Sequence, residues 1–123
     1  LELDPRNATA HHALGLLLIR QKRLPEALSA LAEAARFGED NARYGYVYAV
    51  ALNSAGQGSK ATQELETVLV KHPNDRETLM ALVAFQRHTG NLDAARDYAR
   101  RLATLEPENP EVRALLQQVE ATR

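Results

Sequence analysis

Apolar residues recur along the first third of the chain at the spacing of one helical face. In residues 8–21 this face carries Leu14, Gly15, Leu18 and Ile19. That spacing predicts an amphipathic helix. Pro25 follows a short break and suits the first turn of a second helix, which we expect to extend to about Phe37. Its apolar stripe consists of Ala27, Leu28, Leu31, Ala34 and Ala35. The pattern predicts a helical hairpin.

The next segment is locally ambiguous. Tyr44, Tyr46 and Tyr48 alternate with other residues, and a period of two is typical of a β-strand. The segment nevertheless occupies the same place in the chain's periodicity as residues 8–21, which favours a helix. A turn at 56–58 and an apolar stripe of Ala61, Leu65 and Val68 complete a second predicted hairpin.

Residues 76–109 form the most regular hairpin pattern. Two helical runs flank a Gly-Asn break, and a Pro and an Asn follow. Pro110 and Glu111 then open a last helix with a proline and an acidic residue in its first turn. Its apolar face carries Val112, Leu115, Leu116 and Val119. With no partner helix following it, this helix is predicted to cap the third hairpin.

These units repeat at a spacing of 34 residues. The predicted N-caps are Asn7, Asn41, Asp75 and Asn109. The predicted helix stops are Pro5, Glu39, Pro73 and Pro107. Small residues stand where two helices approach closely, at Ala27, Ala61 and Ala95. Large core residues of the first helices are Leu14, Tyr48, Leu82 and Leu116. The inner turns are marked by Gly56 and Gly90, with Lys22 at that place in the first unit.

The spacing and several motif positions resemble the tetratricopeptide repeat. Leu14-Gly15 matches the family's Leu-Gly pair, and Ala27 with Leu31 matches its Ala–aromatic pair with Leu as the substitute. Residues 1–7, LELDPRN, match the end of a typical repeat almost letter for letter. The resemblance covers the whole chain and implies an all-α, right-handed superhelix of antiparallel helix pairs with a C-terminal capping helix.

One departure from the family pattern predicts unusual packing. The first aromatic site of the motif holds His11, Gly45 and Leu79 in the three units. Gly45 leaves a hole where a large ring usually lies, and we expect Tyr48 or Tyr44 to fill it. Replacing Tyr48 with Ala should then cost several kcal/mol of stability, on the order expected for a buried aromatic.

The resemblance also implies a function and a site. In the family, the first helices line a concave groove that usually binds an extended peptide or a partner helix. The corresponding residues in the first unit are His12, Leu16, Ile19 and Arg20. In the second unit they are Arg43, Tyr46, Val47, Val50 and Asn53. In the third unit they are Glu77, Met80, Ala84, Arg87 and His88. This set predicts an apolar floor with a basic tendency, suited to a segment with apolar and acidic side chains.

One subset of the family grips the C-terminal carboxylates of a chaperone with Lys, Asn and Arg side chains. The corresponding positions here hold His12, Leu16, Val47, Glu77 and Ala81, and none of them matches. We therefore do not expect this chain to bind chaperone tails by that mechanism.

Composition and charge narrow the function classes further. The net charge is −1, which gives no overall field to attract nucleic acid or anionic lipid. RNA binding by related 35-residue helical repeats also disagrees with the strict spacing of 34. The chain has no Cys, so thiolate metal sites and Cys catalysis are excluded. Its longest apolar runs are too short for membrane insertion.

Candidate catalytic and metal-binding groups are better explained by structure. His11 and His12 are adjacent, and adjacent residues on a helix point in different directions, so packing and groove lining are favoured over a metal site. The carboxylates of Glu33, Asp40, Asp93, Asp97 and Glu106 are scattered, which favours solvated surface over an acid–base pair. The basic stripe Arg96, Arg100 and Arg101 is predicted to be a solvated face with helical ion pairs such as Asp97 with Arg101.

We therefore predict a non-enzymatic, cofactor-free interaction module that binds a protein or peptide partner. Residues 1–7 would end a truncated upstream repeat, 8–41, 42–75 and 76–109 would be three repeats, and 110–123 a capping helix. The alternative is an accessory domain that packs on an upstream enzymatic or electron-transfer domain, such as a bacterial glycosyltransferase or a multihaem cytochrome.

The sequence also suggests where the module comes from and how it associates. A start at Leu1 suggests that more chain precedes it, and the excess of Arg over Lys favours a bacterial source, with cytoplasm and periplasm both open. An uncovered first hairpin, at His11, Leu14 and Leu18, should favour self-association.

Overall fold

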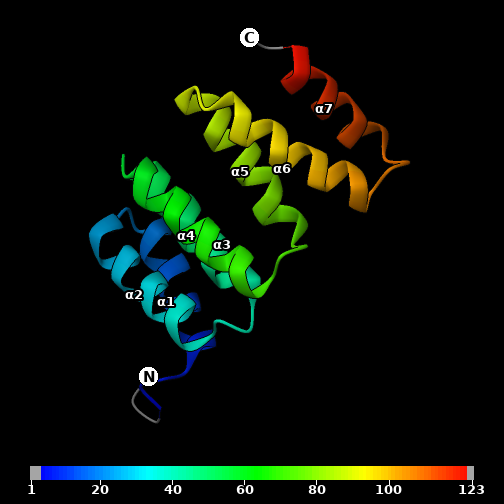
Figure 1. Ribbon diagram of the computed structural model, residues 1–123. Coiled ribbons are helices and arrows are strands. Elements are labelled where there is room, and N and C mark those ends of the chain that lie inside the picture. The colour runs from blue at the N-terminus through cyan, green and yellow to red at the C-terminus, as the bar shows by residue number, and fades with distance from the viewer. Residues whose placement is uncertain (1–3, 122–123) are drawn as a thin grey trace. The chain divides into compact units, whose positions relative to one another are not determined.

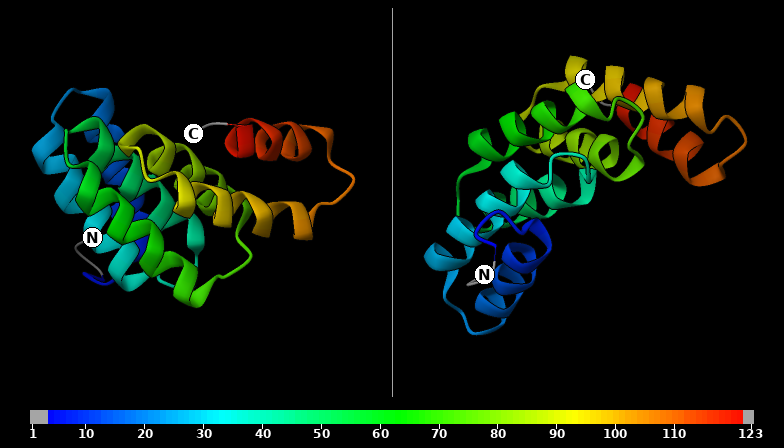
Figure 2. Two further views of the ribbon diagram at one scale, coloured as in Figure 1. Left: turned by 45° about the horizontal axis from the view of Figure 1, so that its top comes forward. Right: turned by 90° about the horizontal axis from the view of Figure 1, so that it is seen from below.

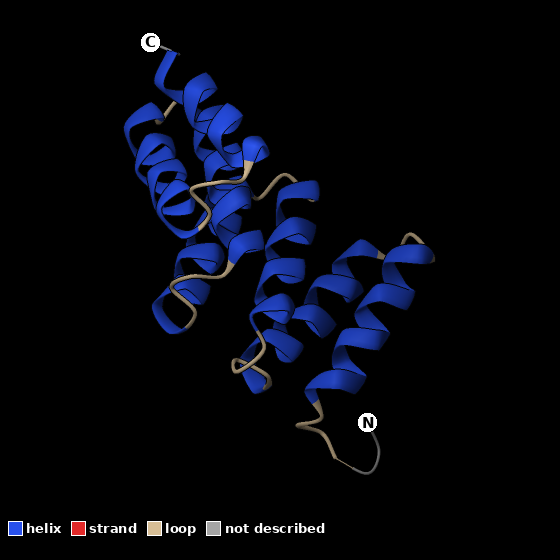
Figure 3. Cartoon of the chain, turned by 90° about the vertical axis from the view of Figure 1, so that its right-hand side faces the viewer, coloured by secondary structure: helices blue, strands red, loops and turns tan. Residues whose placement is uncertain are grey.

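The computed structural model describes residues 4–121, and these residues form helices and connecting turns without a strand (Figures 1 and 3). The helices are α1 (Ala8–Arg20), α2 (Leu24–Phe37), α3 (Ala42–Ser54), α4 (Gly58–Lys71), α5 (Arg76–Thr89), α6 (Leu92–Leu105) and α7 (Pro110–Ala121). The helix over Ala42–Ser54 confirms that the alternating tyrosines belong to a helix. The first helices begin 34 residues apart, at positions 8, 42, 76 and 110.

The helices fall into two compact units, residues 4–71 and residues 72–121. In the first unit α1 packs on α2, α2 on α3, and α3 on α4. In the second unit α5 packs on α6 and α6 on α7 (Figure 2). Within each unit a second helix therefore contacts both its own partner and the first helix that follows. This arrangement lets short hairpins share one apolar core.

The four predicted N-caps are confirmed. The Asn7 side chain accepts a hydrogen bond from the Ala10 amide at 3.0 Å, and Asn41 accepts one from Arg43 at 3.0 Å. The Asp75 carboxylate accepts bonds from both the amide and the hydroxyl of Thr78, at 3.1 and 2.6 Å. The Asn109 side chain accepts a bond from the Glu111 amide at 2.9 Å. Each cap satisfies an amide that the helix itself leaves unpaired, which fixes where each first helix begins.

The inner turn of each hairpin contains a residue in the left-handed region. Gly56 and Gly90 have φ of 81° and 87°, and Lys22 has φ of 61° at the same place in the first hairpin. Glycine adopts this conformation without a steric penalty, whereas a residue with a Cβ adopts it at a cost of about 1–2 kcal/mol. The turn geometry is thus the same in the three hairpins, although the first one lacks the glycine that favours it.

Lys22→Gly is therefore expected to raise the free energy of unfolding by about 1 kcal/mol, because it removes the left-handed strain at an exposed turn. Thermal unfolding followed by circular dichroism would measure the change. Gly90→Ala is the matched control and should lower stability by a similar amount. Equal melting temperatures for Lys22→Gly and the unmodified chain would contradict this account.

The core follows the predicted stripes in large part, but Ile19 is 39 % exposed, and Leu28, Ala35 and Leu115 are only half-buried. Ala27, Ala61 and Ala95 are fully buried, as expected for close helix contacts, and Leu82 is fully buried too. Leu14 and Leu116 are only half-buried, so these two predicted core residues are partly open to solvent. Each lies on a first helix that lacks a neighbour on one side in the described chain. In the predicted repeat end at 1–7, Leu1–Leu3 lie outside the described residues.

The prediction that a tyrosine fills the space beside Gly45 was wrong. A Cβ built on Gly45 would lie 2.3 Å from Cγ2 of Val68, so a valine from α4 occupies that space. The carboxylate of Glu64 lies alongside, 3.3 Å from the same Cβ position. Partial burial of this group raises the pKa of Glu64. The side chain of Val68 thus occupies the space that a ring would fill at this place.

Candidate functional site

The predicted groove residues of α1 and α3 form an exposed surface within the first unit. Leu16, Ile19 and Val50 are 40 %, 39 % and 39 % exposed, which is high for large aliphatic side chains on a packed helix. We call this surface the α1–α3 face, defined by His12, Leu16, Ile19, Arg20, Arg43, Tyr46, Val47, Val50 and Asn53. His12, Tyr46 and Val47 are half-buried, and the other members are exposed. Helical spacing places the members on one side of each helix.

Polar and ring contacts hold the N-terminal halves of α1 and α3 together. The rings of His12 and Tyr44 lie 4.7 Å apart between centroids, tilted by 33°. The Tyr44 hydroxyl shares a hydrogen bond of 3.0 Å with the hydroxyl of Thr9. A Cβ on Gly38 would lie 2.5 Å from the Tyr44 ring and 2.7 Å from the Ala8 side chain, so the α2–α3 connection closes tightly over the same contact. Tyr44 therefore fixes the two halves of the face to one another.

The charged members of the face are basic. Its charged side chains are Arg20 and Arg43, and it carries no carboxylate. Burial, and secondarily the positive charge of Arg43, lower the pKa of His12 below its usual value. The Nδ1 atom of His12 is buried without a hydrogen-bond partner. Both effects favour the neutral imidazole, so the positive charge near neutral pH comes from the two arginines.

The predicted groove residues of α5 lie in the second unit. Glu77, Ala84, Arg87 and His88 are exposed and Met80 is half-buried. They share one side of α5 in the way that the α1 and α3 residues share theirs. The structure describes this helix within residues 72–121, so a groove that continues from α3 to α5 stays a prediction.

The two adjacent histidines contact different neighbours, as predicted for packing residues. The His11 ring lies 6.0 Å from that of Phe37, and its Nε2 donates a hydrogen bond of 2.7 Å to the carbonyl of Pro5. His12 turns instead toward Tyr44. Among residues 4–121 no three His, Cys, Asp or Glu side chains gather in a way that could hold a metal ion. In that same part of the chain no helix is long and apolar enough to cross a bilayer.

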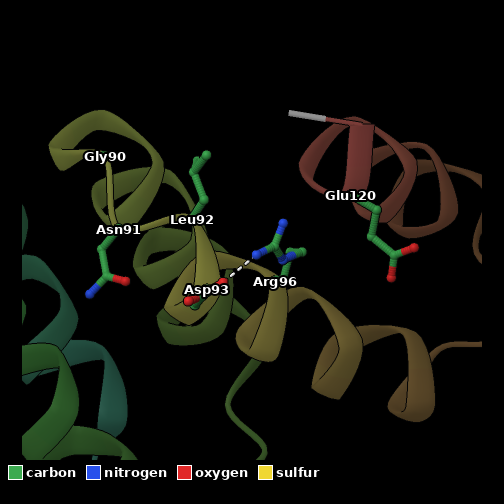
Figure 4. Close-up of a pocket in the computed structure, with 6 residues that line it drawn as sticks. All are labelled: Gly90, Asn91, Leu92, Asp93, Arg96 and Glu120. Carbon is green, nitrogen blue, oxygen red and sulfur yellow. Dashed lines mark hydrogen bonds and ion pairs between the residues drawn. The ribbon is translucent and has the colours of Figure 1, made fainter. Parts of the chain in front are cut away.

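A polar hollow of about 550 Å³ lies between the start of α6 and α7 (Figure 4). Arg96 projects into it and pairs with Asp93, while Glu120 on the opposite side pairs with Arg100 at 3.1 Å. These charges are therefore satisfied within the protein. The predicted pair of Asp97 with Arg101 is replaced by another contact, because Arg101 donates a hydrogen bond of 2.6 Å to the carbonyl of Pro73.

A second hollow, of about 360 Å³, opens at the edge of the first hairpin and has a mostly apolar lining. It is lined by His11, Leu14, Leu18, Glu26, Ser29, Ala30 and Glu33. From the sequence we expected His11, Leu14 and Leu18 to be uncovered at this place, but Leu18 is buried. The prediction did not include Leu17, which is 46 % exposed. At the equivalent places in later repeats, Ala51 and Val119 are 4 % and 0 % exposed and Phe85 is half-buried. The 34-residue spacing could have indicated that Leu17 is open, because no helix precedes α1 in the described residues.

Comparison with known proteins places these features in a family. Tetratricopeptide repeat models match residues 52–119 and residues 1–42. No curated protein sequence matches the chain.

Solved structures share the fold at low sequence identity. The first tetratricopeptide domain of Spaghetti (RPAP3), bound to the HSP90 peptide SRMEEVD, has a TM-score of 0.77 at 17 % identity, and the match covers 96 % of each chain. The Sgt2 tetratricopeptide domain from Aspergillus fumigatus has a TM-score of 0.75 at 17 % identity, with 96 % of this chain and 83 % of that one covered. MamA from Desulfovibrio magneticus RS-1 has a TM-score of 0.76 at 20 % identity, with 91 % and 63 % covered.

The 34-residue spacing of capped helices, the left-handed inner turns and the matching models agree with one another. The chain belongs to the tetratricopeptide repeat family.

Proposed function

We propose that this chain is a protein-interaction module of a larger protein, and that it binds a peptide segment or a partner helix on the exposed faces of its first helices. The module carries out no reaction of its own. The proposed binding residues are those of the α1–α3 face in the first unit and, in the second unit, Glu77, Met80, Arg87 and His88 on α5. The partner is a protein, and nucleic acid is not expected to bind because the net charge is −1.

The observation that carries this proposal is the exposure of three aliphatic side chains on the first helices α1 and α3. Leu16 and Ile19 on α1 and Val50 on α3 are each about two-fifths exposed. Apolar surface gathered on one side of a protein and bordered by charge is typical of an interaction site. The likeness to Spaghetti supports a peptide ligand, since that structure contains a bound peptide.

The test is a pull-down with the double variant Arg43→Glu/Tyr46→Ala, compared with the unmodified chain. The variant is expected to lose most of the captured partner, because it reverses one charge of the face and removes its largest side chain. Lys60→Glu/Gln63→Ala is the matched control, since both residues are exposed on α4. Equal recovery of the same partners by all three proteins would show that the α1–α3 face is not the binding site.

The apolar hollow at the α1–α2 edge favours a second function, that of an accessory domain packed against a neighbouring domain of the same protein. Enzymatic or electron-transfer domains are the candidate neighbours. Leu14 and Leu17 would then be covered in the whole protein, as Tyr48 and Ala51 are covered here. The two functions use different surfaces. Hydrogen exchange of the full-length protein would distinguish them, because only the accessory arrangement protects the α1–α2 edge.

When this edge is left open, we expect the isolated chain to associate with itself at high concentration. Leu17 and the apolar lining of the hollow would pair with those of a second copy and leave water. Light scattering after size exclusion should show a mass that rises with concentration. Leu17→Glu/Ser29→Arg should suppress the rise, since Ser29 lines the hollow and Leu17 is exposed on α1. A monomer at every concentration would contradict the expectation.

A further inference from the structure

We propose that the apolar hollow at the α1–α2 edge is a binding site for one uncharged aromatic side chain, a phenylalanine or a tyrosine, which a neighbouring domain of the same protein supplies. The inference rests on the second of the two functions proposed above, the accessory arrangement, and specifies the contact that anchors it. The hollow shares no residue with the α1–α3 face, so the two sites are separate.

The other repeats indicate what the hollow lacks. Ala30 lines the hollow, and its equivalents at the 34-residue spacing are Glu64 and Tyr98. His11 also lines it, and the equivalent of His11 in the second repeat is Gly45. There the carboxylate of Glu64 lies 3.3 Å from the position of a Cβ on Gly45. Tyr98 is half-buried at the same register in the third repeat. The hollow is therefore the place where the first repeat has a methyl group and the later repeats have a long side chain.

The hollow opens onto the core of the first hairpin. Leu18, Ala27 and Ala30 form a buried cluster, and Leu14 packs against it. Three of these four residues also line the hollow, so an apolar group bound there would leave water and contact the core directly. A volume of about 360 Å³ is small among ligand pockets. The site thus suits one large side chain better than a whole helix.

The side of the hollow formed by His11 favours a ring. The Nε2 atom of His11 donates a hydrogen bond of 2.7 Å to the carbonyl of Pro5, and the imidazole lies 6.0 Å from the Phe37 ring between centroids. The imidazole is therefore held in place before a ligand arrives. An aromatic side chain beside it would add a ring contact, and ring pairs gain energy beyond that of the buried area.

The acidic residues at the hollow favour an uncharged ligand. Glu26 and Glu33 are the charged lining residues, and they pair with Arg23 and Arg36. Both carboxylates are therefore satisfied within the protein, and neither depends on a cation from the ligand. A negative group in the hollow would be repelled by them.

A second copy of this chain has no exposed ring to insert. The aromatic residues of the chain are all buried or half-buried, namely Phe37, Tyr44, Tyr46, Tyr48, Phe85 and Tyr98. In the second and third repeats the equivalent place holds a side chain of the same polypeptide. By the same logic, the ring in the first repeat comes from another domain of the same protein.

The experiment is an NMR titration of the methyl-labelled chain with p-cresol, which reproduces the tyrosine side chain. The methyl signals of Leu14, Leu18 and Ala30 should shift, with a dissociation constant in the millimolar range expected for so small a ligand. The anion 4-methylbenzoate should bind at least tenfold more weakly. Methyl shifts that are absent from the hollow, or equal binding of the anion, would overturn the proposal.

Ala30→Tyr should abolish p-cresol binding, because its ring would occupy the hollow as the register of Tyr98 suggests. Ala13→Tyr is the matched control and should bind as the unmodified chain does, since Ala13 is exposed on α1 and does not line the hollow. Circular dichroism would confirm that each variant is folded. If Ala30→Tyr does not fold, Ala30→Glu, which introduces the residue of the second repeat, should give the same loss. Undiminished binding by the folded variant would overturn the proposal.

Hydrogen exchange of the full-length protein separates this inference from the function on which it rests. Protection of the α1–α2 edge should be lost in Ala30→Tyr and kept in Ala13→Tyr. Protection that survives Ala30→Tyr would overturn the aromatic anchor and leave the accessory arrangement standing. An edge that is unprotected in the unmodified full-length protein would overturn both.

Discussion

Gly15→Val is expected to destabilise residues 4–71 by about 1–3 kcal/mol, the usual cost of overpacking a core. Adding Leu31→Ala to the same chain is expected to restore much of the loss. A Cβ on Gly15 would lie 2.5 Å from Cδ2 and 2.6 Å from Cγ of Leu31, which is too close for the two side chains to coexist. Leu31 is fully buried, so it has little room to move away.

The other repeats indicate how this contact accommodates larger residues. At 34-residue intervals the place of Gly15 is taken by Ala49 and Val83, and the place of Leu31 by Leu65 and Ala99, all of them fully buried. The pair thus changes from Gly–Leu to Ala–Leu to Val–Ala, and the second residue becomes small when the first becomes large. Gly15→Val with Leu31→Ala reproduces the pair of the third repeat.

Urea unfolding of the four proteins would give a double-mutant cycle. Leu31→Ala alone should cost about 2–5 kcal/mol, because it leaves a cavity opposite Gly15. The double variant should be more stable than the sum of the single changes predicts, by at least 1 kcal/mol, as is typical of contacting residues. Additive losses would show that the two side chains do not share one space.

Tyr48→Ala is expected to lower the free energy of unfolding by about 3–5 kcal/mol, while Tyr46→Ala should lower it by about 1 kcal/mol. Tyr48 is 9 % exposed and lies in the core at the place that the fully buried Leu82 has in the next repeat. Tyr46, two positions earlier on the same helix, is half-buried on the α1–α3 face. A two-residue offset turns a helical side chain by about 200°, so the two rings face opposite ways.

Binding should show the reverse order. Tyr46→Ala should weaken capture of the partner while the chain stays folded, whereas Tyr48→Ala should act on binding only to the extent that it unfolds the chain. Thermal unfolding and pull-down at 10 °C would separate the two effects. A small change in melting temperature for Tyr48→Ala would place this ring outside the core. Equal stability losses for both variants would remove the distinction between core and face.

The fold could be predicted closely from local signals because each signal acts through the backbone nearby. An Asn or Asp before each first helix caps amides within three residues, and a left-handed residue follows α1, α3 and α5. The residues of the α1–α3 face were named from the family resemblance together with helical spacing, and Ile19 had also been placed on the apolar stripe. Exposure agrees with that choice at Leu16, Ile19 and Val50.

The contacts between helices were less predictable because they depend on side chains far apart in sequence. The sequence showed that Gly45 lacks a ring, but only packing could show that Val68, 23 residues later, fills the space. The sequence likewise predicted Asp97 as the partner of Arg101. In the structure, the guanidinium of Arg101 instead donates a hydrogen bond of 2.6 Å to the carbonyl of Pro73, which lies in the loop before α5. In both cases the contact is made by a group that is distant in sequence, and the packing of the helices decides which distant group is near enough.

By itself, then, the sequence determined the periodicity, the helix limits and the residues that line each first helix, because all of these follow from backbone geometry within one or two turns. The tertiary structure alone decided how closely the helices approach. It also decided which apolar residues are covered, leaving Leu17 at 46 % exposure while Ala51 and Val119 at the same place are buried. The burial of a residue depends on the helices that surround it, and a repeat pattern by itself predicts the same surrounding helices for every unit. Only the folded chain shows which neighbours are present.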